Sequence, residues 1–242
     1  MNRRTFVKTL PAAALLAGAA AAPAEDAAAP AAPAPKKVDL EPIALPKPET
    51  DGGKSVLAAL KDRRTNRSIS EEKLPPQMLS NLLWAAFGVN RESGPFKQIG
   101  RTAASASNSQ EIDLYVVMPE ASYLYEAAPH RLIPVVAGDQ RATVGRGQRG
   151  AMTTAPANLI FVADIAKYAK ARLQEPGLKD PEIQKSYYNV AVGLIAGNVF
   201  LFAASQGLAA WFHNCNKPAL TTALKLRPDQ RVLYAQTVGY PA

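Results

Sequence analysis

The longest stretch without charge constrains the fold most. Residues 187–212 read YYNVAVGLIAGNVFLFAASQGLAAWF and contain no Asp, Glu, Lys or Arg. The length alone allows a membrane-spanning helix, and Gly193-x-x-x-Gly197 matches a motif by which helices pair in membranes. A helix that is apolar on all sides is also typical of the middle of a large core or of a dimer.

Polar residues inside this stretch favour the second interpretation. Asn189, Asn198, Ser205 and Gln206 fall within it, Gly207 would stop a helix there, and no basic cluster flanks both ends as a membrane anchor. We therefore predict one long buried helix over residues 183–206, without stable membrane insertion. An integral membrane protein that spans through residues 190–210 is the alternative.

The charge balance limits the kind of partner. The 242 residues carry a net charge of +8, and Arg3, Arg4 and Lys8 near the start account for three of these charges. The remaining +5 suits an anionic ligand but not the dense basic face of a nucleic-acid-binding protein. A single cysteine and two histidines exclude an intrachain disulfide and argue against a Cys- or His-rich metal site.

The first 24 residues have the organisation of an export signal. A charged start precedes an Ala-rich apolar middle, and Ala22-Pro23-Ala24 matches a cleavage pattern. The start NRRTFVK resembles the twin-arginine signal, with a Sec signal as the alternative. The twin-arginine route carries proteins that are already folded. We therefore expect residues 1–24 to direct periplasmic export through the twin-arginine machinery, and we expect a cofactor inserted before export.

Residues 25–53 are rich in Ala and Pro and predict a disordered linker, so that the folded domain spans 54–242. Hydrophobic periodicity then predicts interspersed helices and strands, without strict alternation, which favours an α+β fold over a doubly wound α/β fold. The predicted helices are 55–63, 76–88, 165–173, 183–206 and 218–226. The predicted strands are 114–118, 122–126, 131–136, 158–164, 208–212 and 232–240, with 158–164 central and covered on both faces.

Several familiar catalytic and cofactor-binding motifs are absent or lack the neighbouring structure that they require. GRGQRG at 145–150 matches G-x-G-x-x-G, but a proline and a strand follow it where a dinucleotide fold needs a helix. No G-x-S-x-G motif is present, so a hydrolase serine is unsupported. His213 beside Cys215 could indicate a thiol nucleophile, but a surface or hydrogen-bonded histidine is the more ordinary interpretation.

Two polar clusters could hold a ligand. KDRRTNRSIS at 61–70 follows a predicted helix and leads directly into an apolar one, so its arginines and hydroxyl could bind a phosphate. Composition alone leaves a phosphate site and a solvated turn equally open. RTAASASNSQ at 101–110 could let a flat ligand approach the backbone, although for this cluster alone a plain Ser/Ala loop is the better interpretation.

The order and spacing of these clusters resemble the nitroreductase-like flavoprotein family, in the branch that includes azoline-oxidising enzymes. The family places Arg-Arg-Ser-x-Arg before LxxLLWAAxG, then Arg-Thr-x-Pro-Ser-Ala and a strand LYVV. This chain has Arg63-Arg64-Thr65-Asn66-Arg67, LSNLLWAAFG at 79–88, Arg101-Thr102, Ala104-Ser105-Ala106 and LYVV at 114–117. Late in the chain, Asn198 and the run AASQGL at 203–208 match a family helix. The resemblance covers about 54–240.

The resemblance implies a central, mostly antiparallel sheet flanked by helices, and a homodimer with FMN at its interface. It assigns Arg63, Arg64 and Thr65 to the phosphate and ribityl chain, and Arg67 to the N1/C2-carbonyl edge of the flavin. A cation at that edge would stabilise the reduced flavin. The resemblance also implies that further residues contact FMN: Ser105, Ser107 and Asn108 beside the ring, Asn198 near the ribityl chain, and Ala209 and Ala210 beside N5.

The implied function is that of an exported FMN-dependent oxidoreductase acting on a small molecule, with no catalytic side chain besides the flavin and with an unknown substrate and electron donor. Ala104 in place of the family's Pro and Gly197 in place of its Gln would loosen the site, whereas Thr65 in place of Ser is harmless. The sequence stops at GYPA, so a basic residue that contacts the phosphate in many relatives is expected to be missing. These departures support the alternative, a non-enzymatic flavin-binding protein on the same fold.

Overall fold

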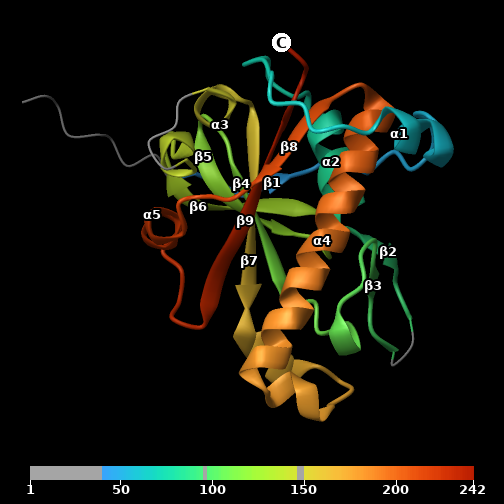
Figure 1. The fold of residues 1–242 in the computed structure, drawn as a ribbon, viewed down its shortest axis with the longest axis vertical. Coiled ribbons are helices and arrows are strands. Elements are labelled where there is room, and N and C mark those ends of the chain that lie inside the picture. Colours follow the sequence, from blue (N-terminus) through green and yellow to red (C-terminus); the bar gives the residue numbers. More distant parts are fainter. Residues whose placement is uncertain (1–39, 95–96, 146–149) are drawn as a thin grey trace, which may run out of the picture. The chain divides into compact units, whose positions relative to one another are not determined.

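The computed structural model describes residues 40–94, 97–145 and 150–242 (Figure 1). The predicted export signal, the linker up to residue 39 and the centre of GRGQRG at 146–149 lie outside the described residues.

A seven-stranded sheet in the order β1-β6-β5-β4-β7-β9-β8 forms the centre of the domain, and every neighbouring pair in it is antiparallel. This arrangement confirms the predicted mostly antiparallel α+β fold. A separate hairpin pairs β2 with β3. The strands are β1 (Ile43–Ala44), β2 (Val89–Arg91), β3 (Gly100–Arg101), β4 (Ile112–Val117), β5 (Ala121–Glu126), β6 (Arg131–Ala137), β7 (Ala157–Asp164), β8 (Ala209–His213) and β9 (Gln230–Gly239).

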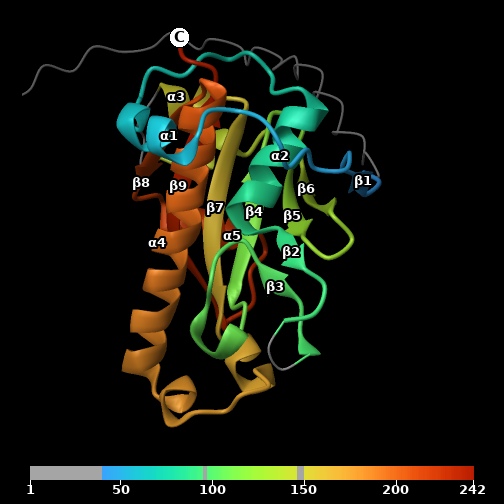
Figure 2. The ribbon, with the colours of Figure 1, turned by 90° about the vertical axis from the view of Figure 1, so that its right-hand side faces the viewer.

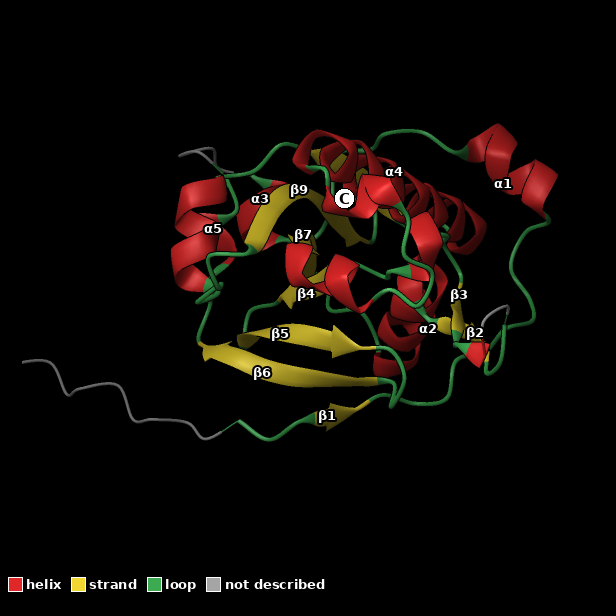
Figure 3. Ribbon diagram, turned by 90° about the horizontal axis from the view of Figure 1, so that it is seen from below, coloured by secondary structure: helices red, strands yellow, loops and turns green. Residues whose placement is uncertain are grey.

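Strand β7 occupies the centre because it can be buried on both faces. All eight of its residues are buried, as its continuous apolar run predicted. Even-numbered residues of the neighbouring β4, such as Leu114 and Val116, pack in one cluster with the helices α2 (Pro76–Phe87) and α4 (Pro181–Gln206). Odd-numbered residues, such as Tyr115 and Val117, pack with α5 (Lys217–Ala223). Figure 3 shows these two helical layers on opposite sides of the sheet.

Helix α4 begins and ends at capping residues. The Asp180 carboxylate accepts hydrogen bonds from the backbone N–H groups of Glu182 and Ile183, 2.9 and 3.3 Å away. Gly207 ends the helix with a left-handed φ of 72°, which a glycine adopts without steric cost. The predicted helix over 183–206 is therefore confirmed, with two further residues at its start. By length and composition alone α4 could cross a membrane, a test that core helices of soluble proteins also pass.

Only one face of α4 is buried in the single chain. That face carries Ala191, Val192, Ile195, Ala196, Val199 and Ala203. On the other face, Val190 is 59% exposed and Leu194 46% exposed. The predicted buried helix is thus covered on one face in the single chain, and its opposite face is an exposed apolar stripe.

Two expectations about local structure are wrong. Residues 165–173 do not form an α-helix, because Ile165–Lys170 form a short 3₁₀ helix, η4, capped by the Asp164 side chain. A second short 3₁₀ helix, Pro176–Lys179, follows. Residues 40–53 do not belong to a disordered linker either. Strand β1 pairs with β6, and the Glu49 N–H donates to the Asn81 side chain over 2.8 Å.

His130 fastens this N-terminal segment to the domain. Its Nε2 lies 2.7 Å from the Ser80 hydroxyl, which donates to the Pro46 carbonyl over 2.6 Å. Its Nδ1 lies 2.9 Å from the Tyr125 hydroxyl. Burial lowers the pKa of His130 below its ordinary value of 6.5. Burial therefore favours the neutral ring in the folded chain.

We expect the free energy of unfolding to fall as the pH drops below about 6.5, because the unfolded chain then binds a proton that the folded His130 resists. His130→Gln should cost about 1 kcal/mol at pH 8 through lost hydrogen bonds. It should also flatten the pH dependence of stability between pH 6.5 and 5.5. Urea unfolding of parent and variant across this range measures both effects, and equal slopes would contradict the assignment to His130.

Candidate functional site

The arginine cluster lies in a loop that three other segments hold in place. Arg63 caps α1 (Val56–Asp62), its N–H bonding to the Ala59 carbonyl. The Asn66 N–H then donates to the Ala210 carbonyl of β8 over 3.0 Å. Further along, the Ser70 N–H donates to Tyr240 over 2.8 Å, and Ile69 forms a β-bridge with Pro241. The loop is therefore anchored to the sheet, unlike a free solvated turn.

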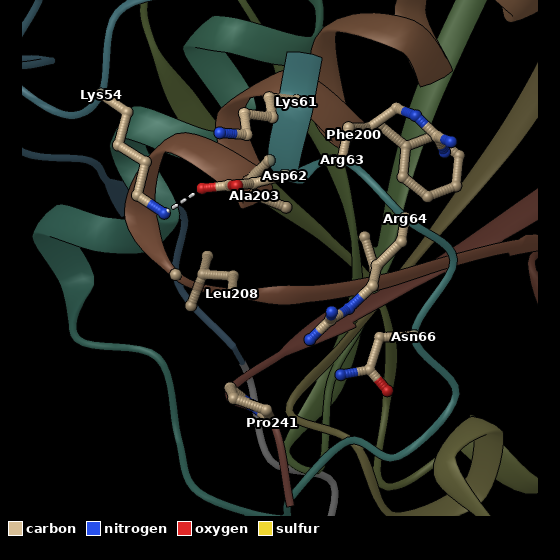
Figure 4. A pocket seen from close by; sticks show the side chains of 13 residues that line it. Lys54, Lys61, Asp62, Arg63, Arg64, Asn66, Phe200, Ala203, Leu208 and Pro241 are labelled. Carbon is tan, nitrogen blue, oxygen red and sulfur yellow. Dashed lines mark hydrogen bonds and ion pairs between the residues drawn. The ribbon is translucent and has the colours of Figure 1, made fainter. Parts of the chain in front are cut away.

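A pocket of about 420 Å³ opens between this loop, the end of α4 and β8 (Figure 4). Lys61, Arg63 and Arg64 line it, and they have no ion-pair partner among the described residues. Asp62 is the one acid in the lining, and Lys54 neutralises it across 2.6 Å. The pocket therefore has an uncompensated positive charge, which an anionic ligand would balance.

The opposite wall of the pocket is apolar. Phe200, Ala203, Leu208 and Ala210 line it. The Arg63 guanidinium carbon lies 5.5 Å from the centre of the Phe200 ring, and Figure 4 shows the two side chains together. This contact is a cation–π interaction that orients the arginine while leaving its N–H groups available for a ligand. Cations along one wall and small apolar residues along the other suit a ligand with an anionic end and an apolar body.

Arg67 lies apart from this pocket. Its guanidinium carbon is 5.5 Å from the centre of the Trp211 ring, and that ring is itself 4.5 Å from the ring of His213. The arginine cluster is thus divided into two, with Arg63 and Arg64 at the pocket and Arg67 against β8. Thr65 is exposed between them and does not line the pocket.

Most of the other predicted site residues lie outside this pocket in the single chain. Ser105, Ser107 and Asn108 are in or beside η2 (Ala106–Asn108), between β3 and β4, and Figure 2 shows that segment at the opposite end of the domain from α1. The Asn198 amide donates to the Thr102 carbonyl over 3.1 Å and lines a different hollow of about 320 Å³. Of the two predicted alanines, Ala210 lines the arginine pocket.

Sequence reasoning missed some residues of the pocket. Phe200 lies two positions after Asn198, and its spacing from Ala203 and Ala204 on the same helix could have indicated one shared face. Lys61 was noted only as part of the basic cluster. Trp211 could not be paired with Arg67 from the sequence, because their contact depends on how the loop crosses β8.

His213 does not act on Cys215 in this structure. Its Nδ1 donates to the Asn214 carbonyl over 2.8 Å, and its Nε2 lies 2.8 Å from the Thr237 hydroxyl. Burial lowers the pKa of His213. Because both ring nitrogens already have hydrogen-bond partners, the histidine is a bonded part of the core and not a base poised for the thiol.

Comparisons with known proteins identify the family of the chain. The family model described as Nitroreductase family matches residues 60–240. Among solved structures, a candidate nitroreductase from Ralstonia eutropha JMP134 is 32% identical, with a TM-score of 0.73 over 83% of this chain and 90% of the other. No curated protein matches significantly.

Two further structures share the fold at low identity. A candidate nitroreductase from Anabaena variabilis ATCC 29413 is 17% identical, with a TM-score of 0.61 over 77% of this chain and 38% of the other. The E. coli microcin synthetase complex, solved with truncated pro-MccB17 bound, is 15% identical, with a TM-score of 0.60 over 76% and 73% of the two chains.

The chain belongs to the nitroreductase family, whose members are typically FMN-dependent oxidoreductases. Homodimers with FMN at the interface are also typical of the family.

Proposed function

We propose that this protein is an exported, homodimeric FMN-dependent oxidoreductase that acts on a small molecule. The observation that carries the proposal is the arginine pocket, where Arg63 and Arg64 face apolar residues of α4 across about 420 Å³. Family membership supplies the reaction class, and the pocket supplies a place in this chain for the phosphate of the cofactor.

The residues present fit FMN. Arginine binds phosphate bidentately, and Arg63 and Arg64 have no ion-pair partner among the described residues, since the nearby Asp62 is paired with Lys54. The small side chains of Ala203 and Ala210 leave room for a bulky group beside them. Arg67, held against Trp211, is the cation assigned to the N1/C2-carbonyl edge of the ring. When bound, FMN would supply two-electron or hydride chemistry through its N5 atom, and the protein would bind, orient and tune it.

A complete site requires a second copy of the chain. Ser105 and Asn108 lie at the far end of the domain from Arg63, so one chain does not bring both predicted sets of contacts to one ligand. The exposed apolar stripe of α4, with Val190 and Leu194, offers the surface on which a partner would pack. In such a dimer the loop 105–108 of one chain would border the ring held by the other.

The alternative is a flavin-binding protein without turnover, supported by Ala104 and Gly197. A side chain at Gly197 would meet open space. The glycine therefore leaves unfilled the room that the family's Gln side chain would occupy. An absorbance spectrum of purified protein separates these functions from a protein without flavin. Bleaching by dithionite with recovery in air supports flavin binding, and only turnover with a donor and a substrate supports the enzyme. Protein without bound or reconstitutable FMN would overturn both.

Export is proposed from the sequence NRRTFVK alone. Replacing Arg3 and Arg4 by lysines should leave the precursor in the cytoplasm. A receptor that recognises the planar arrangement of donors on a guanidinium does not accept an ammonium in its place. Fractionation followed by immunoblotting measures the distribution. Replacing Lys8 by Arg is the matched control and should leave export intact. Unchanged periplasmic yield from the double-lysine variant would indicate a Sec-type signal.

A further inference from the structure

A second positively charged hollow lies under the loop 105–110, away from the arginine pocket. Two adjoining cavities of about 300 and 200 Å³ share the lining residues Gln98, Ile99, Arg101 and Asn108. Lys167 and Lys170 line the first, and Arg91 lines the second. None of the described residues that line either cavity carries a carboxylate. Four cations therefore surround this space without an acid in its walls.

Arg101 is the central cation of this hollow, and its partners are all neutral. Its Nε donates to the Gln110 side-chain carbonyl over 2.7 Å, and its Nη1 donates to the Phe87 backbone carbonyl over 3.0 Å. Its guanidinium carbon lies 4.7 Å from the centre of the Phe87 ring. Burial lowers the pKa of Arg101 below its ordinary value. A half-buried cation whose hydrogen-bond partners are all neutral is costly, and an anion placed beside it would offset that cost.

The neighbouring lysines add to this charge. The Lys167 ammonium lies 2.5 Å from Asp113, whose other oxygen accepts a hydrogen bond from Gln230 over 3.0 Å. The carboxylate below the hollow is thus already engaged. Lys170 is exposed and has no ion pair among the residues that the structure describes. The positive charge of Arg101 and Lys170 is left for a ligand to balance.

The loop over the hollow is held in an uncommon backbone conformation. Three residues of this loop have a backbone φ in the left-handed region, which residues other than glycine rarely adopt. They are Ser107, Asn108 and Gln110, with φ values of 50°, 51° and 50°. Hydrogen bonds impose this conformation, since the Asn108 and Gln110 amides donate to the Ile99 carbonyl over 3.1 and 2.9 Å. Such strain is concentrated where a loop must present groups to a ligand.

We propose that this hollow binds the acidic group, a carboxylate or a phosphate, of a small anionic substrate. The proposal rests on the proposed function, in which the loop 105–108 borders the flavin ring of the partner chain. An anion held by Arg101 and Lys170 would then be fixed beside that loop, with the rest of the molecule directed toward the ring. The enzyme would accordingly prefer organic acids or phosphate esters to neutral compounds.

The test is calorimetric titration of the full-length, FMN-loaded protein with benzoate and, separately, with inorganic phosphate. At least one anion should bind, more weakly as ionic strength rises. Lys170→Ala should weaken binding about threefold to tenfold, because an exposed cation is lost from the site. Arg101→Lys should weaken anion binding at least about tenfold, because the planar guanidinium with its paired donors is lost while the charge remains. Lys179→Ala removes an equally exposed lysine outside the hollow and should match the parent.

The outcomes separate this inference from the proposed function. Binding of benzoate alone assigns a carboxylate, and binding of phosphate alone assigns a phosphate ester. If the protein holds FMN but binds neither anion, or if Lys170→Ala matches Lys179→Ala, the inference is overturned and the proposed function stands. If no FMN can be loaded, the proposed function fails, and the same titration of the apoprotein still decides whether the hollow is an anion site.

Discussion

Replacing Arg63 by alanine is expected to weaken FMN binding by about one to two decades. The variant loses a charge-assisted hydrogen bond to the phosphate, which contributes about 1.5–3 kcal/mol. The fold should be retained, because the Arg63 side chain is exposed and its structural role, capping α1, is performed by its backbone N–H. Equilibrium dialysis of apoprotein against FMN measures the dissociation constant directly.

Arg67→Ala is the matched control, since it removes the same side chain from the same loop. Arg67 lies against Trp211 and not in the pocket. Its loss should therefore leave FMN affinity nearly unchanged but lower the midpoint potential of the bound flavin, because the reduced form loses a counter-charge. Dithionite titration with a reference dye measures that potential. If both variants bind FMN as tightly as the parent at an unchanged potential, the arginine loop has no part in flavin binding.

Leu194→Glu is expected to convert the proposed dimer to monomers and to remove FMN binding with it. Leu194 is 46% exposed in the single chain, so the substitution should fold normally, but a dimer along α4 would bury one carboxylate from each copy among apolar groups. The cost should be about 3–5 kcal/mol, or two to four decades in the dimer dissociation constant. Sedimentation equilibrium over a range of protein concentrations measures it.

A glutamate at an exposed position of the opposite layer provides the control for added charge. Thr222→Glu, on α5, should sediment as the parent does. A parent that is monomeric at all concentrations, or a Leu194→Glu variant that remains dimeric, would show that α4 is not the interface. A protein soluble only in detergent would instead favour the membrane interpretation of α4.

The sequence predicted the elements that have strong local signals. The apolar run of β7 and the capped helix α4 were assigned correctly. A strand buried on both faces has a continuous apolar sequence, and a glycine marks the end of the helix. The short segment after β7 was not assigned correctly, because its 3₁₀ conformation depends on the Asp164 cap and on packing around Tyr168. Strand β1 was missed because only two residues pair, at the sheet edge.

The sequence predicted the candidate site only for residues that lie in a single loop. Arg63 and Arg64 follow directly from the motif, and the structure places them in one pocket. The sequence could not reveal that Ser105 and Asn108 lie at the other end of the domain, because a motif gives order along the chain and not position in space. The contact of Arg67 with Trp211 joins residues about 140 positions apart, which no local pattern encodes.

The contacts that hold the arginine loop also determine when this loop can become ordered during protein synthesis. Ile69 bridges Pro241, so the loop is completed only by residues made about 170 positions later. Until that late segment is released from the ribosome, the loop lacks its edge partner and has no fixed geometry for a phosphate. A nascent chain could therefore not capture its cofactor as it emerges. Loading of the proposed cofactor would therefore follow synthesis of the complete chain and precede the proposed export in the folded state.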